Sequence, residues 1–158
     1  MTPGREEEYA QQEAQLDDLY REVILDHYRN PRHRGSLPAP TVSREGYNPL
    51  CGDEITLELT VNGGVVQDVA VRGGGCSISQ ASASMMAEAI VGRTLQEAEA
   101  LFGDFTAMMQ GSDEVAPESL GDLEALSGVR KFPVRVKCAT LAWHTLREAL
   151  EALDQGNG

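Results

Sequence analysis

Two runs of alternating apolar and polar residues, joined by a glycine-rich turn, constrain the fold of this chain most strongly. Residues 54–61 (EITLELTV) carry isoleucine, leucine or valine at every second position, with glutamate and threonine between them. Residues 62–64 (NGG) follow, and residues 65–72 (VVQDVAVR) form the second run. Alternation predicts a strand with one buried face, and the short glycine turn predicts a hairpin. The hairpin therefore predicts an antiparallel sheet with one face to be covered.

Helical patterns, with apolar residues at three- and four-residue steps, lie on both sides of this hairpin. They predict helices at about 16–30, 77–91, 94–102 and 138–153. The stretch 31–49 is rich in Pro, Gly and Arg and predicts a loop with at most a short edge strand around Thr41–Arg44. Because the strands precede most of the helices, we expect an α+β fold in which about three antiparallel strands carry helices on one face.

The length of 158 residues suits one domain with a buried core. We expect a flexible acidic extension at residues 1–14, a single domain at 15–153 and a disordered tail at 154–158. The formal net charge of −12 argues against a nucleic-acid partner, since binding to phosphates requires basic surface. No apolar run reaches the roughly 18 residues that span a bilayer. The chain begins without the apolar segment of a secretory signal, so we expect a cytoplasmic protein with no membrane partner.

Three cysteines lie at the predicted ends of elements rather than inside them. Cys51 precedes the first strand of the hairpin, and Asp53 follows it after one glycine. Cys76 precedes a predicted helix, and Cys138 lies at the start of another. If these ends meet at one edge of the sheet, three thiolates and a carboxylate surround one position, which is a donor set that suits zinc. The spacing matches no CxxC rule, so scattered structural thiols remain the alternative.

Three segments resemble the cysteine motifs of the IscU/NifU-like iron–sulfur cluster assembly proteins. They are NPLCGDEITLELTVNGG (48–64), GGGCSISQASASMMAEAI (73–90) and FPVRVKCATLAWHTL (132–146). The resemblance covers roughly residues 16–153 and is greatest to the SufU branch. Lys137 stands where the scaffold branch has a histidine, and residues 103–130 are similar to an insertion of the SufU branch. An IscU/SufE-like fold is what this resemblance implies.

The resemblance also implies a Zn²⁺ site formed by Cys51, Asp53, Cys76 and Cys138. Cys51 matches the sulfur acceptor of the family, and Arg135 matches a basic residue that helps to engage the partner. That partner is a SufS-type, pyridoxal-phosphate-dependent cysteine desulfurase, and the sulfur passes on to downstream assembly components. In the implied mechanism a histidine of the desulfurase replaces Cys51 on zinc, and the freed thiolate attacks the outer persulfide sulfur. The alternative for Arg135 is a solvated charge at a strand end.

Two other functions stay open at this point. The same ligands suit iron, so the chain is alternatively a scaffold on which a [2Fe–2S] or [4Fe–4S] cluster is built and passed to apo-proteins. A third hypothesis is an interaction module that zinc stabilises without chemistry. Whether the chain counts as an enzyme, a sulfurtransferase, also stays open, because it leaves each half-reaction carrying the sulfur. His27 is expected in the core, and His144 is not expected to be a ligand.

Overall fold

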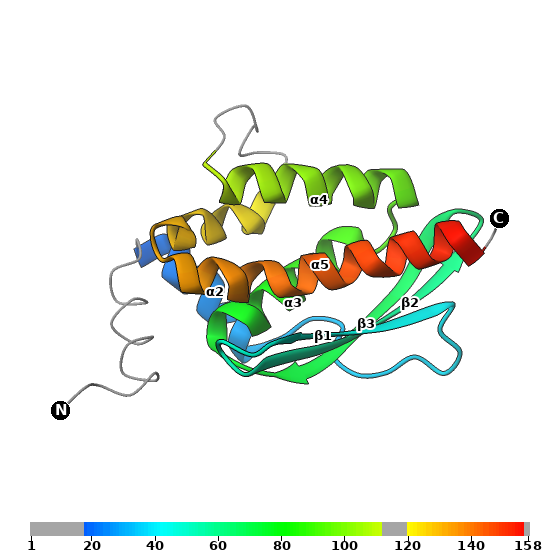
Figure 1. Ribbon diagram of the computed structural model, residues 1–158, viewed down its shortest axis with the longest axis horizontal. Helices are drawn as coiled ribbons and strands as arrows, with labels where there is room; N and C mark the ends of the chain where they lie inside the picture. Colours follow the sequence, from blue (N-terminus) through cyan, green and yellow to red (C-terminus); the bar gives the residue numbers. More distant parts are fainter. Residues whose placement is uncertain (1–17, 112–119, 157–158) are drawn as a thin grey trace.

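The computed structural model describes residues 18–111 and 120–156, and these contain a three-stranded antiparallel sheet with helices (Figure 1). The elements are α2 (Asp18–Arg29), β1 (Val42–Asn48), β2 (Asp53–Asn62), β3 (Val65–Gly74), α3 (Ser77–Ile90), α4 (Leu95–Met109), the 3₁₀ helix η2 (Gly121–Lys131) and α5 (Pro133–Gly156). The strands lie in the order β1-β2-β3, and both neighbouring pairs are antiparallel. The α+β class with helices on one face of the sheet is confirmed.

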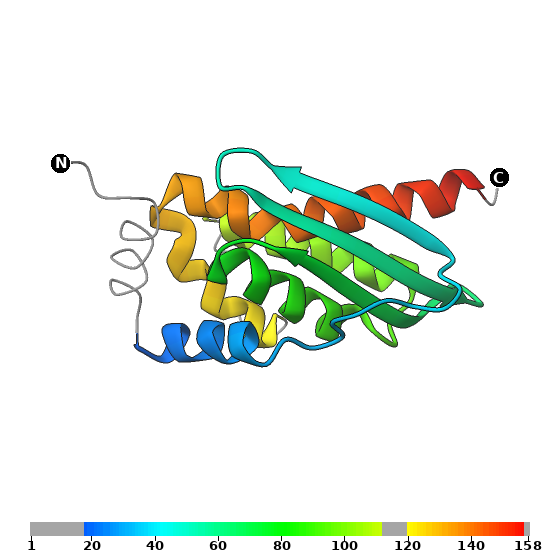
Figure 2. The same cartoon turned by 90° about the horizontal axis from the view of Figure 1, so that it is seen from below.

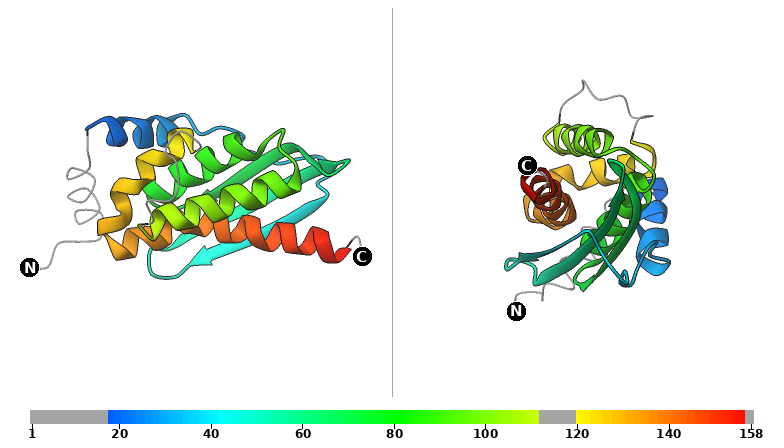
Figure 3. Two further views of the ribbon diagram at one scale, coloured as in Figure 1. Left: turned by 90° about the horizontal axis from the view of Figure 1, so that it is seen from above. Right: turned by 90° about the vertical axis from the view of Figure 1, so that its right-hand side faces the viewer.

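The helices form layers on the inner face of the sheet. α5 packs against β1 and β2, while α3 packs against β3 and α2 packs against α3. Figure 2 shows the strands in front of this layer, and Figure 3 shows α4 on the side of α5 away from the sheet. On β2, Leu57 and Leu59 are fully buried, as the alternation in this strand predicts. The two-residue period thus sets which face the helices cover.

The long helix α5 approaches the sheet closely because small residues line its path. A Cβ atom added to Gly46 on β1 would collide with Thr145 Oγ1 and press on Ile55 and Leu141. On the other side of α5, Trp143 is fully buried and its ring stacks on Phe105 of α4 at 4.5 Å between centroids. Glycine on β1 and the aromatic pair on the opposite side therefore fix the position of α5 between the sheet and α4.

Several boundaries differ from the expectations. α5 begins at Pro133 rather than near residue 138. Proline is favourable at the first position of a helix, because the backbone N–H group that it lacks would have no partner within the helix there. α4 continues to Met109, beyond the predicted end near 102. β1 spans Val42–Asn48, since its whole length pairs with β2. The expected short strand and short helix were therefore underestimates.

The structure describes only part of the two ends of the chain. α5 runs to Gly156, so residues 154–156 of the expected disordered tail are helical, and that expectation was wrong for them. The expected N-terminal extension 1–14, the last two residues and part of the expected insertion, 112–119, lie outside the described residues. Within 18–111 and 120–156, no helix combines the length and apolar character needed to cross a membrane.

Candidate metal centre

Four structural elements bring the predicted ligands to one end of the sheet. Cys51 lies in the turn between β1 and β2, and Asp53 is the first residue of β2. Cys76 is the N-cap residue of α3, directly after the glycines that end β3. Cys138 lies in the second turn of α5. The cysteines are therefore at or near element ends, as predicted, although Cys138 is inside its helix rather than at its start.

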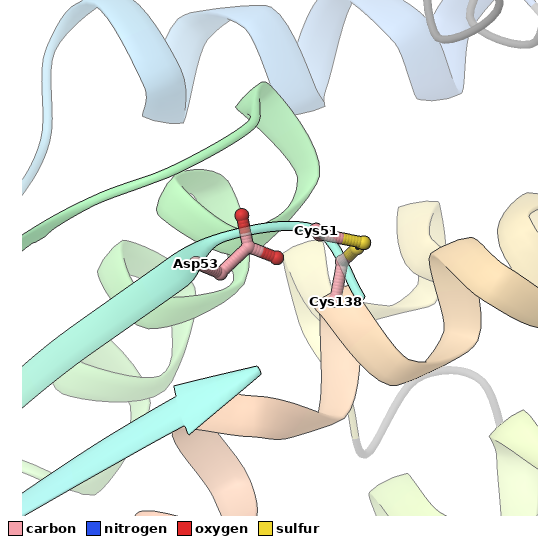
Figure 4. A group of neighbouring side chains, drawn as sticks. All are labelled: Cys51, Asp53 and Cys138. Atoms are coloured by element: carbon pink, nitrogen blue, oxygen red, sulfur yellow. The ribbon is translucent and has the colours of Figure 1, made fainter. Parts of the chain in front are cut away.

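Three of these side chains share one small volume. The sulfurs of Cys51 and Cys138 are 2.7 Å apart, and one ligand atom from each of Cys51, Asp53 and Cys138 lies within 4.8 Å of the others. Figure 4 shows the two sulfurs together, with the carboxylate of Asp53 beside them. Zinc bonds of about 2.0–2.3 Å place two ligands of one ion less than about 4.6 Å apart. The three ligand atoms are close enough to share one ion once the two sulfurs move apart to about 3.8 Å, the separation that tetrahedral zinc requires.

The carboxylate of Asp53 has one oxygen ready for an ion. The residue is fully buried, and its Oδ1 accepts a hydrogen bond from the backbone N–H of Cys76 at 3.0 Å. Its Oδ2 has no hydrogen-bond partner among the described residues. A buried carboxylate oxygen without a partner is unfavourable unless a cation or donor satisfies it. The residues present therefore fit a metal ion.

A glycine makes this arrangement of the carboxylate possible. Gly75 has φ +147°, and a Cβ atom there would collide with Asp53 Oδ1 and crowd Ser79 Oγ. Only glycine combines that backbone conformation with so close an approach. The glycine run before Cys76 therefore has a specific function at its last position.

Cys76 lies beside the other three residues but outside the group whose ligand atoms are all within 4.8 Å. The pKa of its thiol is lowered to about 6, first by a hydrogen bond from the Cys138 thiol and further by the backbone N–H of Ser79, against the effect of burial. The hydrogen bond to Cys76, together with burial, raises the pKa of Cys138. Of these two thiols, Cys76 ionises first and Cys138 keeps its proton. That Cys76 is the fourth ligand stays a prediction.

Arg135 lies in the first turn of α5, three residues before Cys138, and only 1% of its surface is exposed. Its positive charge contributes to the lowered pKa of Cys76. A solvated charge at a strand end is therefore the wrong description of this residue. Its expected function in engaging a partner stays a prediction.

Asn48, a site residue not predicted from the sequence, is 7% exposed at the end of β1. Its Oδ1 accepts a hydrogen bond from the backbone N–H of Leu50, and its backbone oxygen accepts from Cys51 and Gly52. Asn48 therefore shapes the turn that carries Cys51. The signal that was available is the dipeptide Asn48-Pro49, since Asn-Pro is typical of turn initiation.

A second group of candidate ligands consists of His27, Glu88 and Asp122. His27 is fully buried, as expected, and its ring nitrogens contact Ser84 Oγ at 2.9 Å and Asp122 Oδ2 at 3.0 Å. Arg32 lies 3.4 Å from the carboxylate of Glu88. With its histidine already bonded on both sides and a cation adjacent, this group is a structural network between α2, α3 and η2.

Comparisons with known proteins show what the whole chain is similar to. Residues 19–155 match the model of the NifU-like N-terminal domain. The chain is 48% identical over 144 residues to the zinc-dependent sulfurtransferase SufU of Bacillus subtilis (strain 168), covering 91% of this chain and 97% of that protein. It is 43% identical over 138 residues to the iron–sulfur cluster assembly scaffold protein IscU of Streptococcus pyogenes serotype M1, covering 87% and 86% of the two chains. The solved structure of a nitrogen-fixing NifU-like protein (N-terminal) from Brucella abortus superposes with a TM-score of 0.80 at 26% identity, covering 88% of this chain and 96% of that one.

Proposed function

This chain belongs to the family of NifU-like N-terminal domains, and from that premise we propose that it is a zinc-dependent sulfur-transfer protein. It accepts persulfide sulfur from a SufS-type cysteine desulfurase for iron–sulfur cluster assembly. One observation carries this proposal. The thiol of Cys51, which is partly exposed on a turn, lies next to the buried side chains of Asp53 and Cys138. The site therefore combines groups that hold an ion with a thiol that a partner can reach.

Cys51, Asp53, Cys76 and Cys138 would hold the zinc ion. Bound zinc keeps thiols deprotonated at neutral pH and protects them from oxidation. Three thiolates and one carboxylate carry four negative charges, of which a divalent ion balances two. The guanidinium of Arg135 contributes a further positive charge beside Cys76.

Cys51 is the sulfur acceptor because of how the chain presents it. The turn that carries it is short, and Gly52 has φ +69°, so the thiol lies outside regular structure. Cys138 is held within α5 and is fully buried. A protein that docks at this end of the sheet therefore reaches Cys51 before it reaches Cys138.

The transfer of sulfur to Cys51 is an exchange of one S–S bond for another, so it needs no added oxidant. The Cys51 thiolate attacks the outer sulfur of the donor persulfide, the S–S bond of the donor breaks, and the donor cysteine leaves as a thiolate. Cys51 then carries the persulfide. Arg135, buried near the thiolates, holds negative charge in place during this exchange.

A scaffold function is the second candidate, and it is favoured by the relatives that are named as IscU scaffold proteins. Thiolates bind iron as well as zinc, so the same four residues would hold a nascent cluster. In that case the protein purified without air would contain iron and absorb visible light, and it would pass its cluster to an apo-protein.

Metal analysis combined with a turnover assay tests the main proposal. We expect about one zinc ion per chain, and we expect the protein to raise the turnover of cysteine by a SufS-type desulfurase. Removal of zinc with a chelator should abolish the increase, and adding zinc back should restore it. If the turnover of the desulfurase is the same with and without the protein, the proposal is wrong.

A further inference from the structure

The turn that carries Cys51 is organised by one side chain with no assigned function. Asn48 accepts from Leu50 through its side-chain oxygen at 3.1 Å, and its backbone oxygen accepts from Gly52 at 2.9 Å and from Cys51 at 3.3 Å. These bonds use the acceptors of Asn48 and leave its side-chain nitrogen for another contact. Asn48 and Cys51 are therefore opposite ends of one tight turn.

The side-chain nitrogen of Asn48 is buried and has no hydrogen-bond partner among the described residues. A buried donor without an acceptor is unfavourable, and proteins rarely retain one without a reason. Asn48 pairs directly with Asp53 across β1 and β2, so both side chains lie on the same face of the sheet at the metal centre. The free N–H group is thus placed among groups that are anionic when the site is active.

We infer the acceptor for this N–H group from what the neighbouring acceptors already bind. Asp53 Oδ1 accepts from Cys76, and Asp53 Oδ2 is the oxygen available to the metal ion. A persulfide sulfur on Cys51 would add an acceptor that has no donor. A persulfide extends about 2.05 Å beyond the cysteine sulfur and carries its negative charge on the outer atom. An anionic sulfur in a partly buried site needs a hydrogen-bond donor.

We propose that the Asn48 side-chain N–H group donates a hydrogen bond to the outer sulfur of the Cys51 persulfide. Asn48 is then a sulfur-binding residue, and this inference rests on the proposed function, because it requires that Cys51 carries a persulfide. Both residues belong to the same turn, so the donor moves together with Cys51. The bond protects the sulfur until an acceptor arrives.

The side-chain amide of Asn48 tests this in the unaltered protein. The full chain with zinc is loaded with a low-molecular-weight alkyl persulfide, whose outer sulfur passes to Cys51 while an alkyl thiolate leaves. Nuclear magnetic resonance then follows the side-chain amides. We expect the Asn48 signal to shift on loading, while the signal of Asn30, which donates to Asp26 on the surface, stays in place. An Asn48 signal that does not move on loading overturns the proposal.

Two substitutions separate the donor from the turn. Asn48→Asp keeps the oxygen that Leu50 uses but removes the N–H group, and Asn48→Ala removes both without adding charge. In each variant we expect a small thiol to remove the persulfide about tenfold faster than in the unaltered protein, which corresponds to one lost hydrogen bond to a charged group. Zinc content should stay at about one ion per chain. Asn30→Asp is the control for the change of charge.

Three results would overturn the proposal. The first is that the persulfide decays in both variants at the rate of the unaltered protein. The second is that only Asn48→Asp loses the persulfide faster, which makes the added charge the cause. The third is that zinc is lost while the decay of the persulfide is unchanged, which places Asn48 at the metal. Because Cys51 is loaded with an alkyl persulfide and not by a desulfurase, this test does not depend on the proposed function. If the alkyl persulfide loads Cys51 and a desulfurase does not, the transfer function fails and the role of Asn48 is still measured.

Discussion

The three thiols of this protein are chemically unequal, and their surroundings explain the differences. Cys138 is fully buried in the core, whereas Cys51 is only partly buried on a turn. We expect Cys138→Ser to lower the free energy of unfolding by about 1–3 kcal/mol, because a hydroxyl replaces a weakly polar sulfur in the core. Cys51→Ser should change it by less than about 0.5 kcal/mol. Urea unfolding of the reduced, metal-free chains measures both, and equal losses would contradict the assignment of different roles.

The pKa of Cys76 leads to a test that varies pH. The hydrogen bond from Cys138 lowers the pKa of Cys76 to about 6 from an ordinary value of 9.0. The thiolate of Cys76 therefore stabilises the fold at high pH, and this contribution to stability is lost as the pH falls through about 6. In the metal-free chain, alkylation of Cys76 should therefore stay fast down to about pH 6. Cys138, whose pKa is raised, should stay unreactive over that range. Peptide mass spectrometry after timed alkylation gives both rates, and loss of Cys76 reactivity as the pH falls below about 9.0, the ordinary pKa, would refute the expectation.

Gly75 tests whether the carboxylate of Asp53 must lie where the structure has it. Gly75→Ala adds a methyl group that collides with Asp53 Oδ1 at a φ of +147°, so the variant should bind zinc more weakly and lose about 1–3 kcal/mol of stability. Gly74→Ala is the matched control, since a Cβ atom there has nothing within 4 Å. Competition with a chelator gives the zinc affinity, and equal affinities of the two variants would show that Gly75 has no such role.

Among the elements, α3 and α5 are held together by a polar contact inside the core. Ser82 Oγ donates to the backbone oxygen of Ala139 at 2.6 Å and accepts from Trp143 Nε1 at 3.2 Å. Ser82→Ala leaves a buried indole N–H group without this partner, so we expect a loss of about 1–3 kcal/mol and a lower melting temperature.

Ser43→Ala, on the exposed part of β1, serves as the control and should melt within the error of the unaltered chain. Differential scanning calorimetry distinguishes the two variants. Equal melting temperatures would mean that packing alone joins the helices. Because Cys76 is the N-cap of α3 and Cys138 lies in the second turn of α5, loosening the pair should also weaken zinc binding.

Elements with strong local patterns were predictable, and elements set by tertiary contact were not. The hairpin followed from strict alternation at residues 54–61 and from its turn. The start of α5 did not, because FPVRVK (132–137) contains valines that favour strands, and the helix there depends on burial of Arg135 and Cys138 against other elements. The length of β1 depends on pairing with β2, which no property of residues 42–48 encodes alone.

At the scale of the whole molecule, the site exists because one end of the sheet collects the β1–β2 turn, the start of α3 and the first turns of α5. Patterns in the sequence placed Cys51, Cys76 and Cys138 near element ends, but convergence on an ion rested on the resemblance to a family. Asn48 and Gly75 were not found, because a buried donor and a close backbone approach become visible only after the elements are packed.

The central claim is that Cys51 alone takes the sulfur, while the other ligands stay in place. The most direct measurement is peptide mass spectrometry of the zinc-loaded chain after brief incubation with a SufS-type desulfurase and cysteine. The account predicts a mass increase of one sulfur atom on the peptide that contains Cys51, and no increase when the chain carries Cys51→Ser. Added sulfur on the peptides of Cys76 or Cys138, or on none of the three, would contradict it.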